Sequence, residues 1–496
     1  MDPCDLDATE ARWLIGCKRL SPVELAQSCI DRAEAVNHAI NALVVPDFER
    51  MLDAARAAER KVMTGGPLGA LHGLPVCVKD MVDVAGLPTT FGSEIFAGNV
   101  AKADDPMIAQ LRAEGALMMG KANNPEWSAG GNTRNAVYGA TGNPFDPSRS
   151  AAGSSGGSAA ALAVGISPLA TGSDTGGSLR NPAAFCGVVG FRPSHGVVPG
   201  HSRAMGFLPL PSNGPMARNV TDAALMLSAM IRPDRRDPWV SVAQGRTHYD
   251  AGDFARLARV DLGSARVAVT EDFGFAMVEH TVAEAFRAKI ARFEHVFARA
   301  ERTHPDCTGA DDAFAILRAV MFSGQHRRLL AEHPAQIGPN VRANVAEAEG
   351  YSAIDVGRAM EIQTRIYRDW QVFFERHDFL LAPAVTISPR DWHELYPAEI
   401  DGHPTRSYYH WLSMAYGATL AGHPSVVLPV GRDALGMPFG LQIVGGRGED
   451  VATLAFAATL EHYLASEPDL ARPRPDIAAL TKAPPIAADA EFLGFA

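Results

Sequence analysis

The chain has 496 residues, of which 47% are hydrophobic and 20% are charged, and this composition is typical of a globular protein with a large core. Its net charge is −11 and its Lys and Arg residues form no block, which argues against a nucleic-acid-binding surface. No stretch approaches the roughly 20 apolar residues of a membrane span, and the acidic start MDPCDLDATEARW lacks the basic and apolar regions of a signal peptide. We therefore expect a soluble, cytoplasmic protein that acts on small molecules.

The cysteines are scattered, and no two of them have the C-x-x-C spacing of a zinc site or a redox pair. The six are Cys4, Cys17, Cys29, Cys77, Cys186 and Cys307. This pattern fits a reducing compartment. We expect no disulfide framework, no bound metal and no cofactor.

The predicted elements begin with helices and then change to short strands. Ser21-Pro22-Val23-Glu24 is a capping box with proline in the first turn, so a helix should start here, and a second helix should cover 48–63. From about residue 70 to 215, short β-branched runs at 75–78 and 117–119 alternate with turns rich in Gly, Ser and Asn. The later part predicts helices at 311–332, 353–376 and 451–464 and strands at 379–382, 426–430 and 440–444.

Strands interleaved with long helices over the whole length predict one α/β domain, residues 1–496, with a large mixed β-sheet covered by helices on both faces. We divide it into an N-terminal helical region (about 1–65), a central core (about 70–230), a helical region with C-terminal strands (about 280–465) and an irregular surface tail (about 468–496). No linker or internal repeat interrupts it.

Two neighbouring segments, SAAGSSGGSAAALAVG at 150–165 and ATGSDTGGSLRNPAAFCG at 170–187, hold more Gly and Ser than a packing element needs. Glycine permits close backbone approach, and turns dense in N–H groups bind anions. Because SSGGS contains no Lys or Arg to meet a phosphate, an oxyanion hole is the better interpretation.

A serine nucleophile at neutral pH needs a base within hydrogen-bond reach. His72, His195 and His201 lie in this half of the chain, but none sits in a Ser-His-Asp-like pattern. Lys79 ends the apolar run LPVCVK and would need burial to lower its pKa by roughly three from the ordinary 10.4. The alternative is a strand-end lysine that pairs with Asp80 or Asp83, and the residue pattern alone leaves both open.

The runs LHGLPVCVKD, GSSGGSAAALA, TGSDTGGSLRNPAAFCGVVGFRPS and GPMARNVTDAALML, between about residues 70 and 230, closely resemble the amidase signature family. The resemblance implies the amidase signature fold and a serine amidohydrolase that cleaves linear amide C–N bonds. It makes Ser178 the acylated nucleophile and Lys79 the general base. Ser154, on a cis peptide bond, would relay the proton between them.

The same resemblance assigns roles to the residues around this triad. The oxyanion hole would be formed by the N–H groups of Thr175, Gly176, Gly177 and Ser178. The supporting residues would be Ser155, Asp174 and Arg180. Where the family usually has Gly-Gly, this chain has Ala151-Ala152-Gly153, so only one glycine remains. If Ala152 needs a positive φ, it should cost of order 1 kcal/mol.

Two other motifs compete with this interpretation. Gly153 to Gly157 satisfies G-x-S-x-G, the nucleophile elbow, with Ser155 as the nucleophile, but the approach NPFDPSR is rich in turns rather than a strand. GALMMGKA at 115–122 nearly matches a P-loop, but Ala122 replaces the Ser or Thr that holds magnesium. We interpret the second as a strand end.

The substrate is less strongly specified than the triad. By family resemblance, the segment NPEWSAGG at 124–131 lines the acyl pocket, which gives Trp127, Ser128, Ala129 and Gly130 as candidate substrate-binding residues. The aromatic segment YYHWLSM at 408–414 would cover the same cleft. Apolar or aromatic groups are therefore favoured over charged ones, and an amide is not separated from an ester, carbamate or urea.

Two competing functions remain. One is the glutaminase subunit of a tRNA-dependent amidotransferase, whose pattern has Met-Asp-Glu-Phe where this chain has Asn-Pro-Glu-Trp and acidic and hydroxyl residues where this chain has SMAYG at 413–417. The other is a non-catalytic binding protein, against which the retention of Lys79, Ser154 and Ser178 argues. As partners we expect a small-molecule amide and at most a second copy of the chain in a homodimer, without nucleic acid or membrane.

Overall fold

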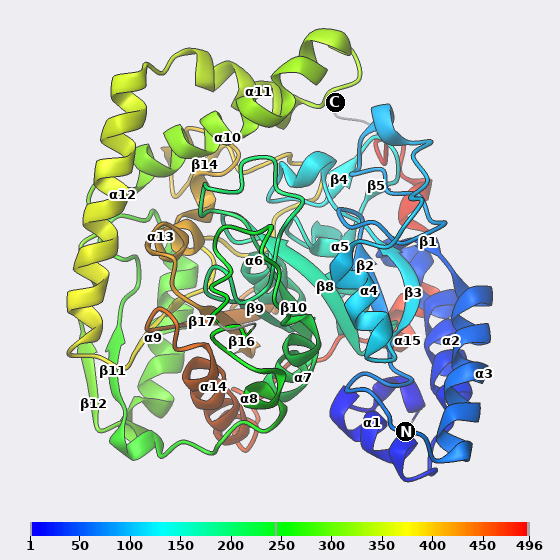
Figure 1. The fold of residues 1–496 in the computed structure, drawn as a ribbon. Coiled ribbons are helices and arrows are strands. Elements are labelled where there is room, and N and C mark those ends of the chain that lie inside the picture. Colours follow the sequence, from blue (N-terminus) through cyan, green and yellow to red (C-terminus); the bar gives the residue numbers. More distant parts are fainter. Residues whose placement is uncertain (1, 244–245, 494–496) are drawn as a thin grey trace.

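A mixed β-sheet of eleven strands runs through the computed structural model, which describes residues 2–243 and 246–493 (Figure 1). Its strands, in spatial order, are β1 (Leu43–Pro46), β3 (Leu117–Ala122), β2 (Pro75–Lys79), β8 (Leu169–Asp174), β10 (Ser212–Ala217), β9 (Val189–Arg192), β16 (Ser425–Arg432), β17 (Pro438–Gly445), β13 (Phe379–Pro383), β11 (Arg266–Val269) and β12 (Arg299–Arg302). Parallel and antiparallel pairs both occur. The predicted α/β class with a large mixed sheet is confirmed.

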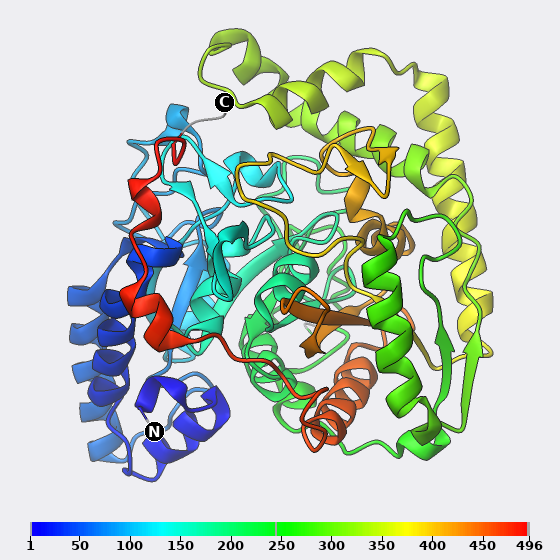
Figure 2. The ribbon, with the colours of Figure 1, turned by 180° about the vertical axis from the view of Figure 1, so that it is seen from behind.

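Helices lie on both faces of this sheet, as predicted, with α2 and α3 beside one end of the sheet and α12 beside the other (Figures 1 and 2). They are α1 (Ala8–Gly16), α2 (Pro22–Ile40), α3 (Phe48–Thr64), α4 (Pro106–Ala113), α5 (Gly156–Ala163), α6 (Arg180–Cys186), α7 (Val220–Met230), α8 (Ala251–Ala255), α9 (His280–Phe293), α10 (Ala310–Glu332), α11 (Pro339–Glu349), α12 (Ala353–Phe374), α13 (Ser413–Ala421), α14 (Asp450–Leu464) and α15 (Ile477–Lys482). None of the described helices combines the length and apolarity needed to cross a bilayer.

Small two-stranded sheets decorate the loops. They are β4 (Arg134–Asn135) with β5 (Gly139–Ala140), β6 (Gly142–Asn143) with β7 (Asp146–Ser150), and β14 (Glu399–Ile400) with β15 (His403–Pro404). The β6–β7 pair occupies the segment expected to be rich in turns, so a short strand does precede the serine-rich loop. That strand is not part of the main sheet.

The predicted start of α2 is confirmed in detail. Ser21 Oγ accepts from the Val23 N–H at 2.9 Å, and the Ser21 N–H donates to Glu24 Oε2 at 3.0 Å, so both halves of the capping box form. The apolar side of this helix, including Leu25, Cys29 and Ala33, is buried in the core.

The directions of the strands place several charged residues at one edge of the sheet. β2 and β8 are parallel, with Cys77 opposite Ala170, so their carboxyl ends reach the same edge. β10 is antiparallel to both β8 and β9, and therefore β9 ends at this edge as well. Lys79, Asp174 and Arg192 are the last residues of β2, β8 and β9. Such an edge is the usual place for a binding site in an α/β protein.

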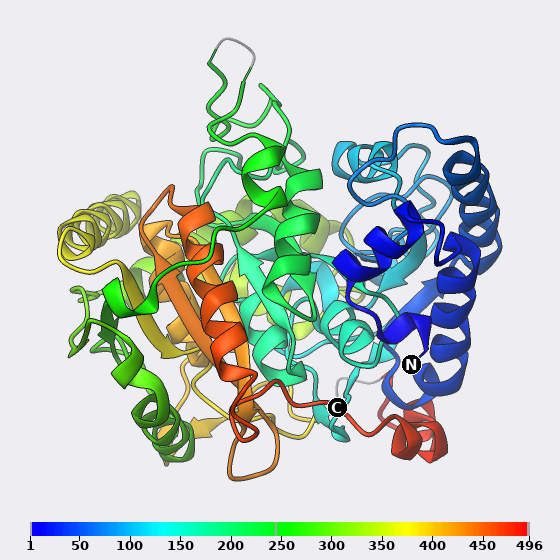
Figure 3. The same ribbon diagram turned by 90° about the horizontal axis from the view of Figure 1, so that it is seen from below.

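The tail from about residue 468 is more ordered than expected, with residues 494–496 lying outside the described residues. It contains α15, whose Leu480 is buried, and it runs beside the N-terminal helices (Figures 2 and 3). The ring of His38 in α2 contacts the carbonyl of Ala483 at 3.0 Å. The many proline residues of this segment suggested an irregular tail, but Asp476 caps a short helix there by accepting from the Ala479 N–H at 3.0 Å.

Candidate active site

Lys79 is almost fully buried at the end of β2, between β3 and β8. Its Nζ donates to Ser154 Oγ at 2.7 Å and to Ser173 Oγ at 3.0 Å. Burial lowers the pKa of this ammonium group to about 7, although the negative charge of Asp174 opposes the shift. A lysine with this pKa is partly neutral at neutral pH and has a lone pair available as a base.

Lys79 does not form the alternative ion pair with Asp80 or Asp83 in the described part of the chain. Asp80 pairs instead with Lys121, whose Nζ lies 3.2 Å from Asp80 Oδ1. Lys121 also donates to the Val82 carbonyl at 2.6 Å. The two buried lysines therefore have different environments, and Lys79 is the one that faces the serine hydroxyls.

Ser154 is fully buried and precedes α5, and its peptide bond with Gly153 is cis, as predicted. The first turn of α5 packs closely against the backbone after β3, since a Cβ atom on Gly157 would lie 2.3 Å from the Asn123 backbone nitrogen. Ala152 adopts φ of +56°, in the left-handed region. Ala152 therefore has the positive φ at which alanine in place of glycine should cost of order 1 kcal/mol.

Ser155 has no hydrogen bond to Lys79 among the described residues. Its Oγ lies 3.4 Å from the Ser173 carbonyl, to which it donates, and its N–H donates to the Ser178 carbonyl at 3.3 Å. Ser155 thus joins the end of β8 and the loop after it to the start of α5. This geometry favours a supporting role over the nucleophile-elbow interpretation, which requires a base beside Ser155.

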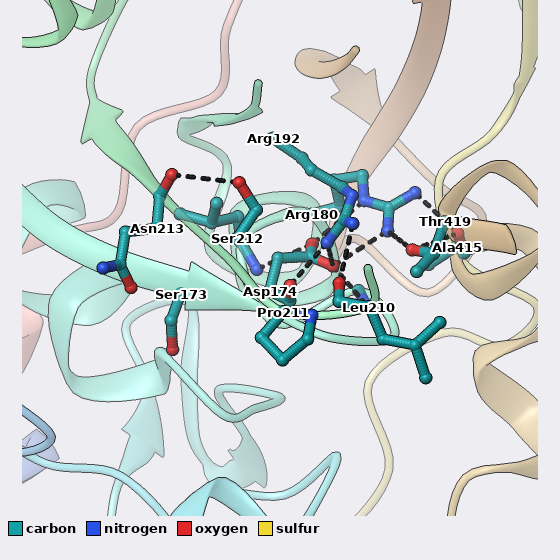
Figure 4. Close-up of polar contacts among 12 residues, drawn as sticks. Ser173, Asp174, Arg180, Arg192, Leu210, Pro211, Ser212, Asn213, Ala415 and Thr419 are labelled. Carbon is teal, nitrogen blue, oxygen red and sulfur yellow. Dashed lines mark hydrogen bonds and ion pairs between the residues drawn. The ribbon is translucent and has the colours of Figure 1, made fainter. Parts of the chain in front are cut away.

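The loop between β8 and α6 is organised by Asp174 (Figure 4). The Asp174 carboxylate accepts from the Gly177 N–H at 2.8 Å and the Leu179 N–H at 3.1 Å. Arg180 contacts both of its oxygens, at 3.0 and 2.9 Å, and Arg192 contacts Oδ1 at 3.1 Å. Burial alone would raise the pKa of Asp174, but the two guanidinium groups and these hydrogen bonds hold it well below its usual value.

Ser178 lies in this loop and is partly exposed, unlike Ser154. The backbone bond from the Ser155 N–H places Ser178 next to the Ser154–Ser155 segment. In the described residues, no hydrogen bond joins Ser154 Oγ to Ser178 Oγ. The structure therefore brings Lys79 and Ser154 into direct contact and places Ser178 in the adjoining turn.

The backbone N–H groups expected to form an oxyanion hole differ from one another. The Gly177 N–H donates to Asp174, whereas those of Thr175, Gly176 and Ser178 donate to no acceptor in the described part of the chain. Gly176 is pressed against α10, since a Cβ atom there would lie 2.7 Å from Cζ of Phe314. Three of the four expected donors thus have no internal acceptor among the described residues.

None of the three histidines contacts the serines among the described residues. The His72 ring contacts the Ala58 carbonyl at 3.1 Å, and His195 contacts Arg192 at 3.2 Å. His201 has no hydrogen bond to Ser154 or Ser178 in the described part of the chain. The alternative of a histidine base has no geometric support.

The segment at 124–131 lies close to the Ser154 loop, where a Cβ atom on Gly153 would be 2.7 Å from the Gly130 carbonyl oxygen. Trp127 and Ser128 have φ of 42° and 59°, and Ser128 is partly exposed. The Trp127 ring lies 4.6 Å from that of His326. The Ala129 carbonyl accepts from Asn340 at 2.8 Å, which fastens this segment to α11.

Sequence reasoning missed Ser173, Arg192 and Phe314. Ser173 is the second acceptor for Lys79 Nζ, and Arg192 is the second cation on Asp174. Arg192 did leave a signal, because it is the one charged residue at the end of the apolar run VVGF. Phe314 comes from a helix far along the chain, and no local pattern places it against Gly176.

The family model described as Amidase matches residues 24–454. The chain belongs to the amidase signature family. It is 34% identical to the acylamidase of Rhodococcus erythropolis over 459 residues, which cover 92% of this chain and 95% of that protein. It is also 34% identical to a glutamyl-tRNA(Gln) amidotransferase subunit of Salinispora arenicola (strain CNS-205), with 93% of this chain and 97% of that protein covered.

Among solved structures, the crystal structure of a bacterial aryl acylamidase of the amidase signature family superposes on this amidase with a TM-score of 0.83 and 29% identity. The match covers 92% of this chain and 96% of that one. The family resemblance noted in the sequence is confirmed, and with it the assignment of the chain as a hydrolase that acts on amides.

Proposed function

We propose that this amidase hydrolyses the amide of a small carboxylic acid to the acid and ammonia or an amine, through an acyl-enzyme on Ser178. The observation that carries the proposal is the 2.7 Å hydrogen bond between Lys79 Nζ and Ser154 Oγ, made by a buried lysine whose pKa is about 7. A base of this pKa serves well at neutral pH.

In the proposed first step, the neutral Lys79 amine takes the Ser154 hydroxyl proton while Ser154 Oγ takes the proton of Ser178. Ser178 Oγ then forms a bond to the amide carbonyl carbon. When the C–N bond breaks, the proton returns through Ser154 to the leaving nitrogen. Water repeats the sequence on the ester, releasing the acid and free Ser178. Catalytic hydrogen bonds are often longer without substrate, so the lack of a Ser154–Ser178 hydrogen bond among the described residues does not oppose this order.

The oxyanion formed in each step would be bound by free backbone donors. The N–H groups of Thr175, Gly176 and Ser178 have no internal acceptor in the described residues, and each such donor contributes about 3–4 kcal/mol in other hydrolases. The Gly177 N–H was also expected to donate to the oxyanion, but its bond to Asp174 gives it a different role. This hydrogen bond would hold the loop in the conformation in which the other three N–H groups point toward the oxyanion.

The side chains around this loop favour an aromatic or apolar acyl group. Phe314, which contacts Gly176, stacks on Tyr416 with ring centroids 4.3 Å apart, and Tyr409 lies 5.7 Å from Phe314. Trp127 lies in a second aromatic group with Phe96 and His326. A flat apolar substrate gains both burial and ring stacking in such surroundings.

The test is a substrate panel of aryl and aliphatic amides, esters, carbamates and ureas, assayed with the unaltered chain and with Ser178→Ala. We expect Ser178→Ala to abolish turnover, and Lys79→Ala to be nearly as damaging. Ser264→Ala, on an exposed serine, is the control. A fluorophosphonate should label Ser178, whereas a label on Ser155 or turnover by Ser178→Ala would exclude this mechanism.

The similarity to glutamyl-tRNA(Gln) amidotransferase subunits over nearly the whole chain supports a second candidate, a glutaminase within a larger assembly. The aromatic surroundings of Gly176 argue against it, because free glutamine is small and zwitterionic. Release of ammonia from glutamine, measured with and without a copurifying protein, distinguishes the two. Efficient glutamine hydrolysis together with poor aryl amide hydrolysis would establish the second candidate.

A further inference from the structure

A cavity of about 620 Å³ lies beyond the end of β9, at the same sheet edge as Lys79 but lined by none of the proposed catalytic residues. Its walls include His195, Trp239, Tyr249, Tyr367 and Arg447. The volume is typical of a site for a small organic molecule. Nothing in the proposed mechanism uses this cavity.

The charge of the cavity is unusual for an acidic protein. Arg246 and Arg447 are among the described residues that line it, and no Asp or Glu is, although the whole chain has a net charge of −11. Asp450 lies behind the wall, where its carboxylate accepts from the Ser194 N–H at 2.8 Å. The side chains that line the cavity among the described residues therefore include positive charges and no negative one.

Arg447 is the better placed of the two arginines to hold a ligand. Its guanidinium group lies 5.1 Å from the centre of the Tyr367 ring and has no carboxylate within ion-pair distance among the described residues. Contact with the ring orients the planar group, whose N–H donors match the two oxygens of a carboxylate. A cation without a counter-ion on a concave surface favours an anion.

His195 is a neutral wall of the cavity, so it neither repels an anion nor attracts one by its charge. Arg192 Nη2 lies 3.2 Å from His195 Nε2 on the side of the β8–β9 charge cluster. Burial and the charges of Arg192, Arg203 and Arg447 hold the pKa of His195 well below its ordinary value, and a hydrogen bond with the Leu210 carbonyl only partly opposes this. The imidazole is therefore a neutral, flat wall of the cavity.

Aromatic rings form the remaining walls. The Trp239 ring lies 6.1 Å from the His195 ring, and its Nε1 donates to the Gly206 carbonyl at 2.8 Å, which fixes its orientation. Tyr249 is also held in place, because its hydroxyl donates to the Gly448 carbonyl and accepts from the Asp450 N–H. Rigid aromatic walls suit a flat apolar body.

We infer that this cavity binds a small aromatic carboxylate. Its carboxylate would accept from the Arg447 guanidinium, and its ring would lie among Trp239, Tyr249 and Tyr367. The inference does not depend on the proposed function, because it uses none of the residues of the triad.

The test uses the Ser178→Ala chain with sodium benzoate as the probe and benzamide as its neutral counterpart, with binding followed by calorimetry and by tryptophan fluorescence. We expect benzoate to bind at least tenfold more tightly than benzamide. Arg447→Gln should weaken benzoate at least tenfold and leave benzamide unchanged. Arg328→Gln, on an exposed arginine of α10, is the matched control.

A second variant tests the aromatic walls. Trp239→Leu should weaken benzoate and benzamide alike and remove the fluorescence change that either ligand causes. Arg447 is exposed, so its variant should fold, and unchanged thermal unfolding would confirm this.

Equal benzoate binding by the Arg447→Gln and Arg328→Gln chains would overturn the inference, because the ligand would then lie elsewhere, for example at the Ser178 loop. Failure of benzoate to bind at millimolar concentration would overturn it as well.

Discussion

Arg192 donates from one guanidinium nitrogen to both the backbone carbonyl and the Oδ1 atom of Asp174, at 2.5 and 3.1 Å. This double contact joins the ends of β8 and β9, on either side of β10 (Figure 4). Both side chains are fully shielded from solvent. The shape of the Ser178 loop therefore depends on a buried charge cluster rather than on regular secondary structure.

Replacement of Asp174 by Asn should destabilise the fold strongly. It would leave Arg180 and Arg192 buried without a counter-charge, and breaking such a pair costs about 3–5 kcal/mol. Urea unfolding measures the change. Asp53→Asn breaks the exposed pair with Arg56 and should cost less than about 1 kcal/mol. Equal effects of the two substitutions would contradict this account of the loop.

The pH dependence of turnover should reflect the unprotonated Lys79 amine. Because burial lowers its pKa to about 7, the neutral fraction grows as pH rises through that value, and kcat/KM should rise and then level off. The folded chain also holds fewer protons than the unfolded chain between about pH 7 and 10, so stability due to this group rises with pH across that window. A profile of kcat/KM against pH measures the inflection.

Ser173→Ala provides a more specific test of the same group. Ser173 Oγ accepts a hydrogen bond from Lys79 Nζ and so stabilises the ammonium form. Its removal should move the inflection of kcat/KM to lower pH. Ser148→Ala, on an exposed serine of β7, should leave the inflection in place. An unchanged profile for Ser173→Ala would show that another group titrates.

Ala152→Gly should stabilise the protein. An L-residue with positive φ costs about 1–2 kcal/mol, and the greater freedom of glycine in the unfolded chain together with the loss of the buried Ala152 methyl group removes most of the gain, which leaves about 0.5 kcal/mol. Denaturant unfolding can resolve this. Ala346→Gly, inside α11 and exposed, should instead destabilise by about 1 kcal/mol. Destabilisation by both changes would mean that Ala152 is not strained.

Phe314→Leu should alter the choice of substrate more than the rate of chemistry. It removes the ring that lies against Gly176 and stacks on Tyr416. We expect kcat/KM for an aryl amide to fall about tenfold relative to a short aliphatic amide. Phe379→Leu, in the ring stack with Phe456, is the control for lost packing. A parallel decrease for both substrates would argue against a role in selectivity.

The long elements of the fold were predictable because their patterns are local. The capping box at Ser21 and the apolar run at 75–78 each contain, within a few residues, the information that forms α2 and β2. The helix at 477–482 was not predicted, since its burial comes from contact with α2 rather than from its own periodicity.

Less of the candidate site than of the fold could be predicted from local sequence patterns. Glycine and serine composition indicated an oxyanion loop, but the choice of Lys79 over a histidine needed the family resemblance, because burial of the amine depends on β3 and β8. The engagement of the Gly177 N–H by Asp174 is a detail of loop geometry. The side chains of Arg192 and Phe314 reach the loop from distant segments, so only the folded chain places them there.

The contact of His38 with the carbonyl of Ala483 spans 445 positions of the chain. During synthesis, α2 leaves the ribosome long before the segment around α15 that covers it. The side chains of α2 that contact this segment in the folded protein therefore have no cover on the nascent chain until then. Because contacts of such sequence separation carry a high loop-closure cost, we expect α15 to dock on α2 late in folding.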